Sequence, residues 1–187
     1  MNARERSRVE TRRRLLEKGI ELFSTKGIAA TRAVDIARAA AVAVGTLYLH
    51  FKDKQGLLRA ILFEGIEELL KSLHSLAAVP LDDVTKAVRA HTELMVRFAE
   101  EHPALCRILF DPESVRSNVS IEITAYLVSM QEKRLREGVD QGIFPHDMDI
   151  RVASHASVGM LINVLDWWTK NPDQADRETV IDTLTRL

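Results

Sequence analysis

The chain has 187 residues (21.1 kDa), 46% of them hydrophobic and 28% charged, and its net charge is −1. These values suit one domain, or a small domain joined to a larger one, and exclude a globally disordered chain. The single cysteine, Cys106, excludes a disulfide framework and a thiolate zinc site, and the absence of a long apolar run or a signal peptide predicts a cytoplasmic protein without a membrane partner.

Apolar residues recur at helical spacing along the chain, and alternating strand-like segments are scarce, so we expect an all-α protein. Helix ends are marked by Gly27, which suits a left-handed cap, by the capping residue Asp53, and by the helix-stopping Pro103. About nine helices are predicted, over residues 4–26, 31–40, 44–50, 53–79, 82 or 83 to 102, 103–111, 119–141, 149–170 and 176–187.

Charge is distributed unevenly. Residues 1–54 hold 12 Lys and Arg against 6 Asp and Glu, whereas residues 55–187 hold 14 against 21. A basic first third favours a polyanionic partner for that part alone. The alternative is that the basic residues only form the solvated face of a helix by chance. For Arg4, Arg6 and Arg8 two interpretations are also open: they form an arm that contacts DNA, or they are simply solvated.

Two short helices joined by a three-residue turn lie in this basic part, a spacing typical of a helix-turn-helix. Small and apolar positions face inward: Ile36, Ala37, Ala40 and Leu47. The outward positions of the second helix are Val44, Gly45, Thr46, Tyr48 and His50. Tyr48, His50 and Lys54 suit phosphate contacts, which fix register. Alternatively, Tyr48 is a packed aromatic side chain and His50 is merely solvated.

The strings LLEKGIELFSTKGIAAT and DIARAAAVAVGTLYLHFKDKQGLL resemble the TetR family of bacterial transcriptional regulators over about residues 9–65. The resemblance implies a three-helix DNA-binding domain, residues 1–54, with its helix-turn-helix at about 32–51. It also implies a helical regulatory domain, residues 55–187, with a small-molecule pocket and a dimer interface. The candidate DNA-binding residues are Thr31, Arg32, Val44, Gly45, Thr46, Tyr48, Leu49, His50 and Lys54.

Three features depart from the family's usual pattern. Ala41 stands at the turn position where Gly is usual, and a left-handed alanine costs about 1–2 kcal/mol. Ala43 replaces a capping Ser or Thr, which forgoes about 1 kcal/mol. Val44 and Leu49 make the reading face poor in hydrogen-bond donors, so we expect base recognition through thymine methyl groups and DNA shape.

The regulatory half offers candidate pocket residues on the predicted inner helix faces: His91, Met95, Phe98, Tyr126, Met130 and His155. Methionine suits irregular pockets, although each of these residues could equally be core, and His155 could lie at a dimer seam.

Apolar residues also recur along the last two helices. They seal either an intramolecular core or a two-fold, four-helix dimer interface, for which the candidates are Ser157, Met160, Val164, Trp167, Trp168, Val180 and Leu184. Because Trp167 and Trp168 are adjacent, they cannot both point the same way, and one indole is expected at a second surface. A homodimer would present two reading heads to a palindromic operator.

The sequence gives less support to other functions. The motifs HExxH, ExxH, GxSxG, GxGxxG, GxxxxGK[ST] and SxxK do not occur, so neither an enzyme, nor a metal site, nor a cofactor is expected. The sequence favours a homodimeric repressor that a small molecule releases from double-stranded DNA. The alternative is a ligand-binding or adaptor protein of the same fold that has lost operator binding, and activation rather than repression stays open.

Overall fold

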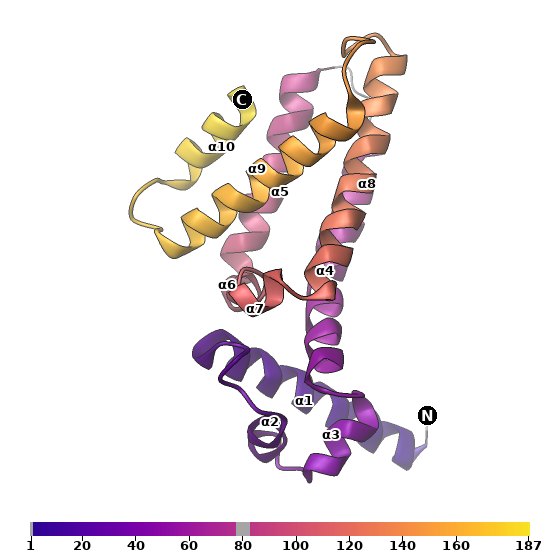
Figure 1. Cartoon of the computed structure of the whole chain (residues 1–187), viewed down its shortest axis with the longest axis vertical. Coiled ribbons are helices and arrows are strands. Elements are labelled where there is room, and N and C mark those ends of the chain that lie inside the picture. Colours follow the sequence, from indigo (N-terminus) through magenta and orange to yellow (C-terminus); the bar gives the residue numbers. More distant parts are fainter. Residues whose placement is uncertain (1, 78–82) are drawn as a thin grey trace. The chain divides into compact units, whose positions relative to one another are not determined.

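The computed structural model describes residues 2–77 and 83–187, which are all-α as expected. Ten helices are formed by these residues: α1 (Ala3–Lys26), α2 (Ala33–Ala39), α3 (Val44–His50), α4 (Lys54–Ala77), α5 (Val84–Glu101), α6 (Pro103–Leu109), α7 (Pro112–Val115), α8 (Asn118–Asp140), α9 (Ile150–Lys170) and α10 (Arg177–Arg186) (Figure 1). The helix beyond the expected nine is α7, a single turn that begins with Pro112 and is capped by Asp111.

Capping residues explain the helix boundaries. Asp83 accepts from the N–H of Lys86 at 3.1 Å, and Asp176 accepts from that of Thr179 at 2.7 Å. These backbone hydrogen bonds lower the pKa of both carboxyl groups. Asp53 similarly accepts from the N–H of Gly56 at 2.7 Å. The alternative cap Asp82 lies outside the described residues.

The two glycines with a positive φ differ in conformation. Gly142, after α8, has a φ of +73°, whereas Gly27, after α1, combines a φ of +82° with a ψ of 158°. Gly27 is therefore a positive-φ cap but not the left-handed helical one that was expected. Its N–H donates to the carbonyl of Phe23 at 3.0 Å, which ends α1 at the predicted residue.

The described residues divide by packing into two compact units. The first comprises residues 2–66 and 104–120, and the second comprises 67–103 and 121–187. Helices α4 and α8 contribute residues to both. The first unit thus includes most of α6 and all of α7, while the expected functional boundary after residue 54 stays a prediction.

In the first unit, α1–α3 pack on the beginning of α4, around the fully buried Leu15, Ile36, Leu47 and Leu58. The close approach of α1 to α4 requires a glycine, because a Cβ on Gly19 would lie 2.8 Å from Cδ1 of Ile61. Cys106 is buried in α6, and burial raises the pKa of its thiol to about 11, so it stays protonated.

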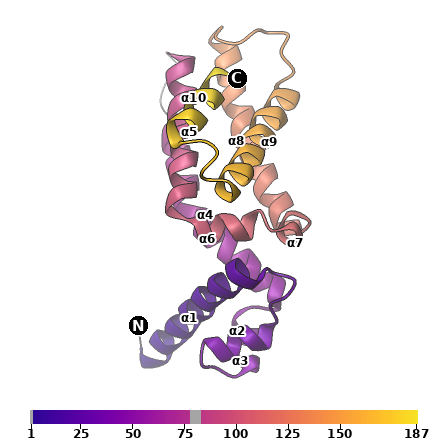
Figure 2. The ribbon, with the colours of Figure 1, turned by 90° about the vertical axis from the view of Figure 1, so that its left-hand side faces the viewer.

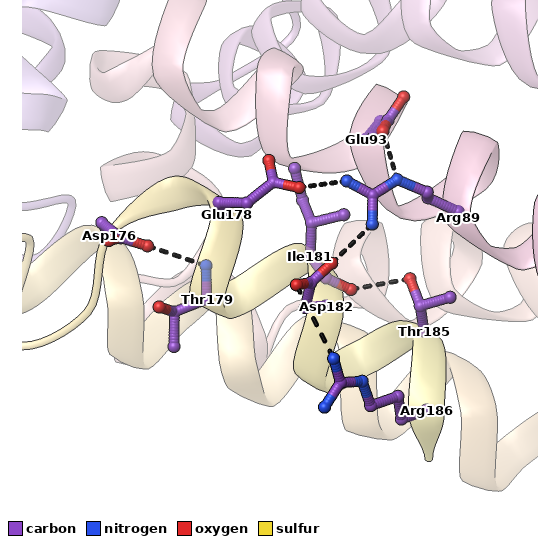
Figure 3. A network of polar contacts seen from close by, with 9 residues as sticks. All are labelled: Arg89, Glu93, Asp176, Glu178, Thr179, Ile181, Asp182, Thr185 and Arg186. Carbon is purple, nitrogen blue, oxygen red and sulfur yellow. Dashed lines mark hydrogen bonds and ion pairs between the residues drawn. The ribbon is translucent and has the colours of Figure 1, made fainter.

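The second unit is built from the end of α4 and from α5, α8, α9 and α10. Figure 2 shows α10 lying against α5. Its buried face carries Val180, Ile181 and Leu184. Beside this apolar contact, Arg89 of α5 donates to Asp182 of α10 at 2.5 Å and also to Glu178 (Figure 3). The α10 helix is therefore docked within its own protomer by both packing and ion pairs.

In the described part of the chain, no single helix is long and apolar enough to cross a membrane; only the sharply bent α2–α3 pair, taken together, meets the length and composition required.

Candidate DNA interface and effector pocket

The turn between α2 and α3 is built as the sequence predicts. Ala41 adopts a φ of +55°, which confirms its left-handed conformation, and the N–H of Val42 donates to the carbonyl of Ala37 at 3.0 Å. Ala43 is the N-cap of α3 and makes no side-chain cap hydrogen bond. The helix is therefore held by its packing, chiefly through the fully buried Leu47, rather than by its cap.

The opposite side of α3 is exposed and largely apolar. Val44, Tyr48 and Leu49 are 40%, 51% and 82% exposed, Gly45 is exposed beside them, and Thr46 is half-buried. Tyr48 is thus not a packed aromatic side chain. A Cβ placed on Gly45 would meet nothing within 4 Å, so its use is to leave room for another molecule rather than for a neighbouring helix. The face carries few hydrogen-bond donors, as the sequence predicts.

Two of the expected contact residues are occupied inside the protein. Thr31 is 1% exposed and precedes α2 instead of opening it; its hydroxyl donates to the carbonyl of Gly27 at 2.8 Å. Lys54 donates from Nζ to the carbonyl of Ile28 at 2.8 Å and lies 3.6 Å from Oε1 of Glu113. Both residues fix the segment between α1 and α2, and their expected contacts with DNA stay predictions. Arg32, by contrast, has an exposed side chain beside Asp35.

A basic cluster lies at the end of α3. His50 is half-buried, and burial, followed by the charges of Arg8 and Arg12, lowers the pKa of its imidazole. Arg12 is engaged by Glu64 and lies over the ring of Phe51, at 5.2 Å from its centroid. Arg8 is exposed and forms no hydrogen bond or ion pair within the described residues.

Arg8 is not part of a loose arm, because α1 begins at Ala3. A capping box closes its first turn, in which Asn2 accepts from the N–H of Glu5 at 2.9 Å. This capping pair is the sequence signal that would have extended the helix to its first residues. The rigid helix brings Arg8 near His50, which makes Arg8 a further candidate phosphate contact.

The second unit contains an apolar cavity of about 190 Å³ between α5, α8, α9 and α10. Three of the expected pocket residues, His91, Met95 and Met130, line it. Apolar side chains make up most of its wall: Leu73, Val84, Val88, Leu127, Leu135, Phe144, Val158, Met160, Leu161, Ile162 and Leu184. Thr92, Gln131 and Arg134 also line the cavity and were not predicted to do so. Helical spacing could have indicated Gln131 and Arg134, because they share a helix face with Leu127.

The other three expected pocket residues lie elsewhere. Phe98 is buried against the ring of His102, with centroids 4.7 Å apart. The hydroxyl of Tyr126 lies 3.1 Å from Nε2 of His74. His155 is exposed in an open hollow on α9 beside Arg151 and Val152.

Most of the expected dimer residues are used within the protomer. Trp168 is buried, and its Nε1–H donates to the carbonyl of Ala175 at 2.9 Å, while Val180 and Leu184 are also buried. Ser157, Met160 and Leu184 line the cavity. Val164 is half-buried, and Trp167 is 41% exposed, so it is the outward-facing indole of the pair. The exposed side of α9 carries, with Trp167, the residues Val152, Ala156, Gly159 and Asn163.

Comparison with known proteins identifies the fold and the family. The sequence profile described as "Bacterial regulatory proteins, tetR family" matches residues 15–61, which include all of α2 and α3. The chain is also 31% identical over 143 residues to the nucleoid occlusion factor SlmA of Vibrio atlanticus (strain LGP32), covering 71% of this chain and 70% of that protein.

The chain belongs to the TetR family.

Other TetR-type proteins are similar along nearly the whole chain. The fatty acid metabolism regulator protein of Bacillus subtilis (strain 168) is 21% identical over 183 residues, which cover 92% of this chain and 91% of that protein. The crystal structure of the transcriptional regulator FadR from Bacillus subtilis in complex with stearoyl-CoA superimposes with a TM-score of 0.79 at 18% identity, covering 93% and 95% of the two chains. This TetR-family chain thus shares its fold with that regulator along nearly its whole length.

Proposed function

We propose that this protein is a homodimeric transcriptional repressor that binds DNA through α3 and is released by a small apolar molecule. The observation that carries the proposal is the helix-turn-helix formed by α2 and α3, which lies in the basic part of a TetR-family chain and leaves the outer side of α3 exposed. We place its action in the cytoplasm, where the DNA of a bacterium lies. No catalytic role is proposed.

The proposed DNA contacts are divided by chemistry. Val44, Gly45, Thr46 and Leu49 approach the base edges, where thymine methyl groups are the matching apolar feature. Phosphate contacts are assigned to Arg8, Arg32, Tyr48 and His50, which fix the register of the helix in the groove.

Two reading heads require a dimer. The exposed side of α9, with Trp167 and the small residues Ala156 and Gly159, supports an interface there because small residues let a second helix approach closely and tryptophan is enriched at interfaces. A two-fold arrangement would match a palindromic site.

The effector is proposed to bind in the cavity of the second unit. Its predominantly apolar wall supports an apolar ligand, and two similar proteins have names that refer to fatty acid metabolism or to stearoyl-CoA. We therefore assign the effector to fatty acids or their thioesters.

The test is fluorescence anisotropy of the purified chain on DNA from immediately upstream of its own gene and on random duplex, at several salt concentrations. A repressor shows a preference of about 10³-fold or more that falls steeply with salt. Weak, equal binding to both DNAs would contradict operator recognition at that site.

The second candidate is an adaptor or ligand-binding protein that has lost operator binding. The uncapped start of α3 and its apolar face favour it. The same titration separates the two functions, because an adaptor shows no steep salt dependence on any DNA.

A further inference from the structure

His91 is one of the few polar side chains in the wall of the cavity. This side chain lines the cavity from α5, between the apolar positions Val88 and Met95. It is half-buried, and it has no hydrogen-bond partner among the described residues. Burial and the charge of Arg134 lower the pKa of its imidazole, so the ring is neutral at pH 7. A neutral imidazole offers one N–H donor and one acceptor, and buried polar groups of this kind normally have a partner.

Arg134 and Gln131 add donors to the same cavity from α8. They lie three residues apart and therefore on one helix face. The side chain of Arg134 is 17% exposed, and its Nη1 lies 3.9 Å from Oε2 of Glu137. No Asp or Glu lines the cavity within the described residues. Arg134 has five N–H donors in addition to its charge, so beside Glu137 it can still donate to a ligand whose polar end accepts hydrogen bonds.

The volume limits the apolar part of that ligand. An apolar cavity of about 150 Å³ suffices for benzene, so about 190 Å³ accommodates roughly eight non-hydrogen atoms. This is about half the length of a stearoyl chain.

We infer that the cavity binds an acyl group of about eight carbons whose carboxylate or thioester carbonyl accepts hydrogen bonds from Arg134 and His91. The inference rests on the proposed ligand-responsive function and adds to it a chain length and two positioning residues for the polar end. Free acid and thioester share this chemistry.

The experiment is isothermal titration calorimetry of the full chain, without DNA, using octanoate, octanoyl-CoA and stearoyl-CoA. One or both octanoyl ligands are expected to bind, at least tenfold more tightly than stearoyl-CoA, and the two octanoyl arms decide between free acid and thioester. Equal or tighter binding of stearoyl-CoA, or no binding of either octanoyl ligand, would overturn the inference.

Variants test the polar end. Arg134→Gln is expected to weaken octanoyl binding by about 10- to 100-fold and His91→Leu by about three- to tenfold, because a charge-assisted hydrogen bond is stronger than a neutral one. Arg136→Gln, on the exposed side of α8, and His146→Leu, in an exposed loop, are matched controls and leave affinity unchanged. Arg134→Lys keeps the charge and restores part of the affinity. Circular dichroism melting selects variants that fold, and unchanged affinity in folded Arg134→Gln and His91→Leu would refute the assignment.

DNA binding of the ligand-free protein is measured in parallel. If the operator is bound but no octanoyl ligand is, the acyl inference is wrong and the repressor proposal stands. If octanoyl ligands bind but no operator does, the cavity assignment holds and the repressor proposal is wrong.

Discussion

Lys54 is joined to Glu113 within the first unit: its Nζ lies 3.6 Å from Oε1 of that carboxylate, which belongs to the short helix α7. The same ammonium donates to the carbonyl of Ile28, and Oδ2 of Asp111 accepts from the N–H of Ile28 at 3.4 Å. Both backbone polar groups of Ile28, its carbonyl and its N–H, are thus hydrogen-bonded to side chains, which holds the segment between α1 and α2 in place. These contacts give Lys54 a positioning role in the DNA-binding unit.

Lys54→Met should therefore lower the free energy of unfolding by about 1 kcal/mol, because the Ile28 carbonyl loses its donor. Urea denaturation measures this change. The salt slope of DNA binding should stay as in the wild type. A slope reduced by about two units, one for each head of the proposed dimer, without loss of stability would instead show that Lys54 contacts phosphate.

Arg8→Met should reduce the salt slope of operator binding by about two units, since each neutralised phosphate contributes about 0.9 and the proposed dimer carries Arg8 in both reading heads. Anisotropy titrations from low to high salt provide the measurement. Arg151→Met, an exposed arginine in the second unit, is the matched control and should leave the slope unchanged. Identical slopes for both variants would remove Arg8 from the interface.

Operator affinity should increase as the pH falls from 7.5 to 5.5. Burial and the charges of Arg8 and Arg12 hold the pKa of His50 below 6.5 in the free protein, and a phosphate beside it would raise that pKa. Binding then takes up a proton at acidic pH, which strengthens the complex by up to about tenfold.

The pH series is repeated with His50→Gln, which should respond less, and with His146→Gln, which should respond as the wild type does. If operator affinity in His50→Gln still increases as the pH falls, the pH dependence arises from another titratable group.

Replacing thymine by uracil in each half-site should weaken binding, because uracil lacks the methyl group that Val44 and Leu49 are proposed to contact. The expected loss is about 0.8 kcal/mol, or roughly fourfold, for each buried methyl. Competition between the two duplexes gives the ratio directly. Equal affinity would exclude methyl readout.

Ala41→Gly should raise the free energy of unfolding by about 1 kcal/mol, since the strain of a left-handed alanine exceeds the entropy cost of glycine. Ala39→Gly, on the exposed side of α2, is the control and should lower stability by a similar amount. Both changes are read from urea denaturation. A destabilised Ala41→Gly would show that the turn carries no strain.

The sequence predicts the helices well because their ends depend on neighbouring residues. Asp53, Asp83 and Asp176 cap helices locally, and the turn at Ala41 and Ala43 is predicted from the resemblance to the TetR family. These features need no knowledge of the tertiary structure. The single-turn α7 is missed because an Asp-Pro pair can either end one helix or begin the next. The sequence analysis takes Asp111 and Pro112 as a helix end, whereas they begin α7.

Side-chain roles depend on the tertiary structure and are predicted less well. Lys54 and Thr31 have the chemistry of phosphate contacts, but their partners are carbonyl groups more than three residues away. Val180 and Leu184 form an apolar helix face, yet the pattern cannot say whether α5 or a second protomer covers it. In the cavity, helical spacing finds His91 and Met95 but cannot exclude Phe98 on the same helix.

The α3 helix depends on one buried side chain. Leu47 anchors α3, while Val44, Tyr48 and Leu49 project outward. Substitutions at these three positions therefore leave the core untouched. Variants at these three positions can therefore be compared for DNA preference without a change of stability intervening.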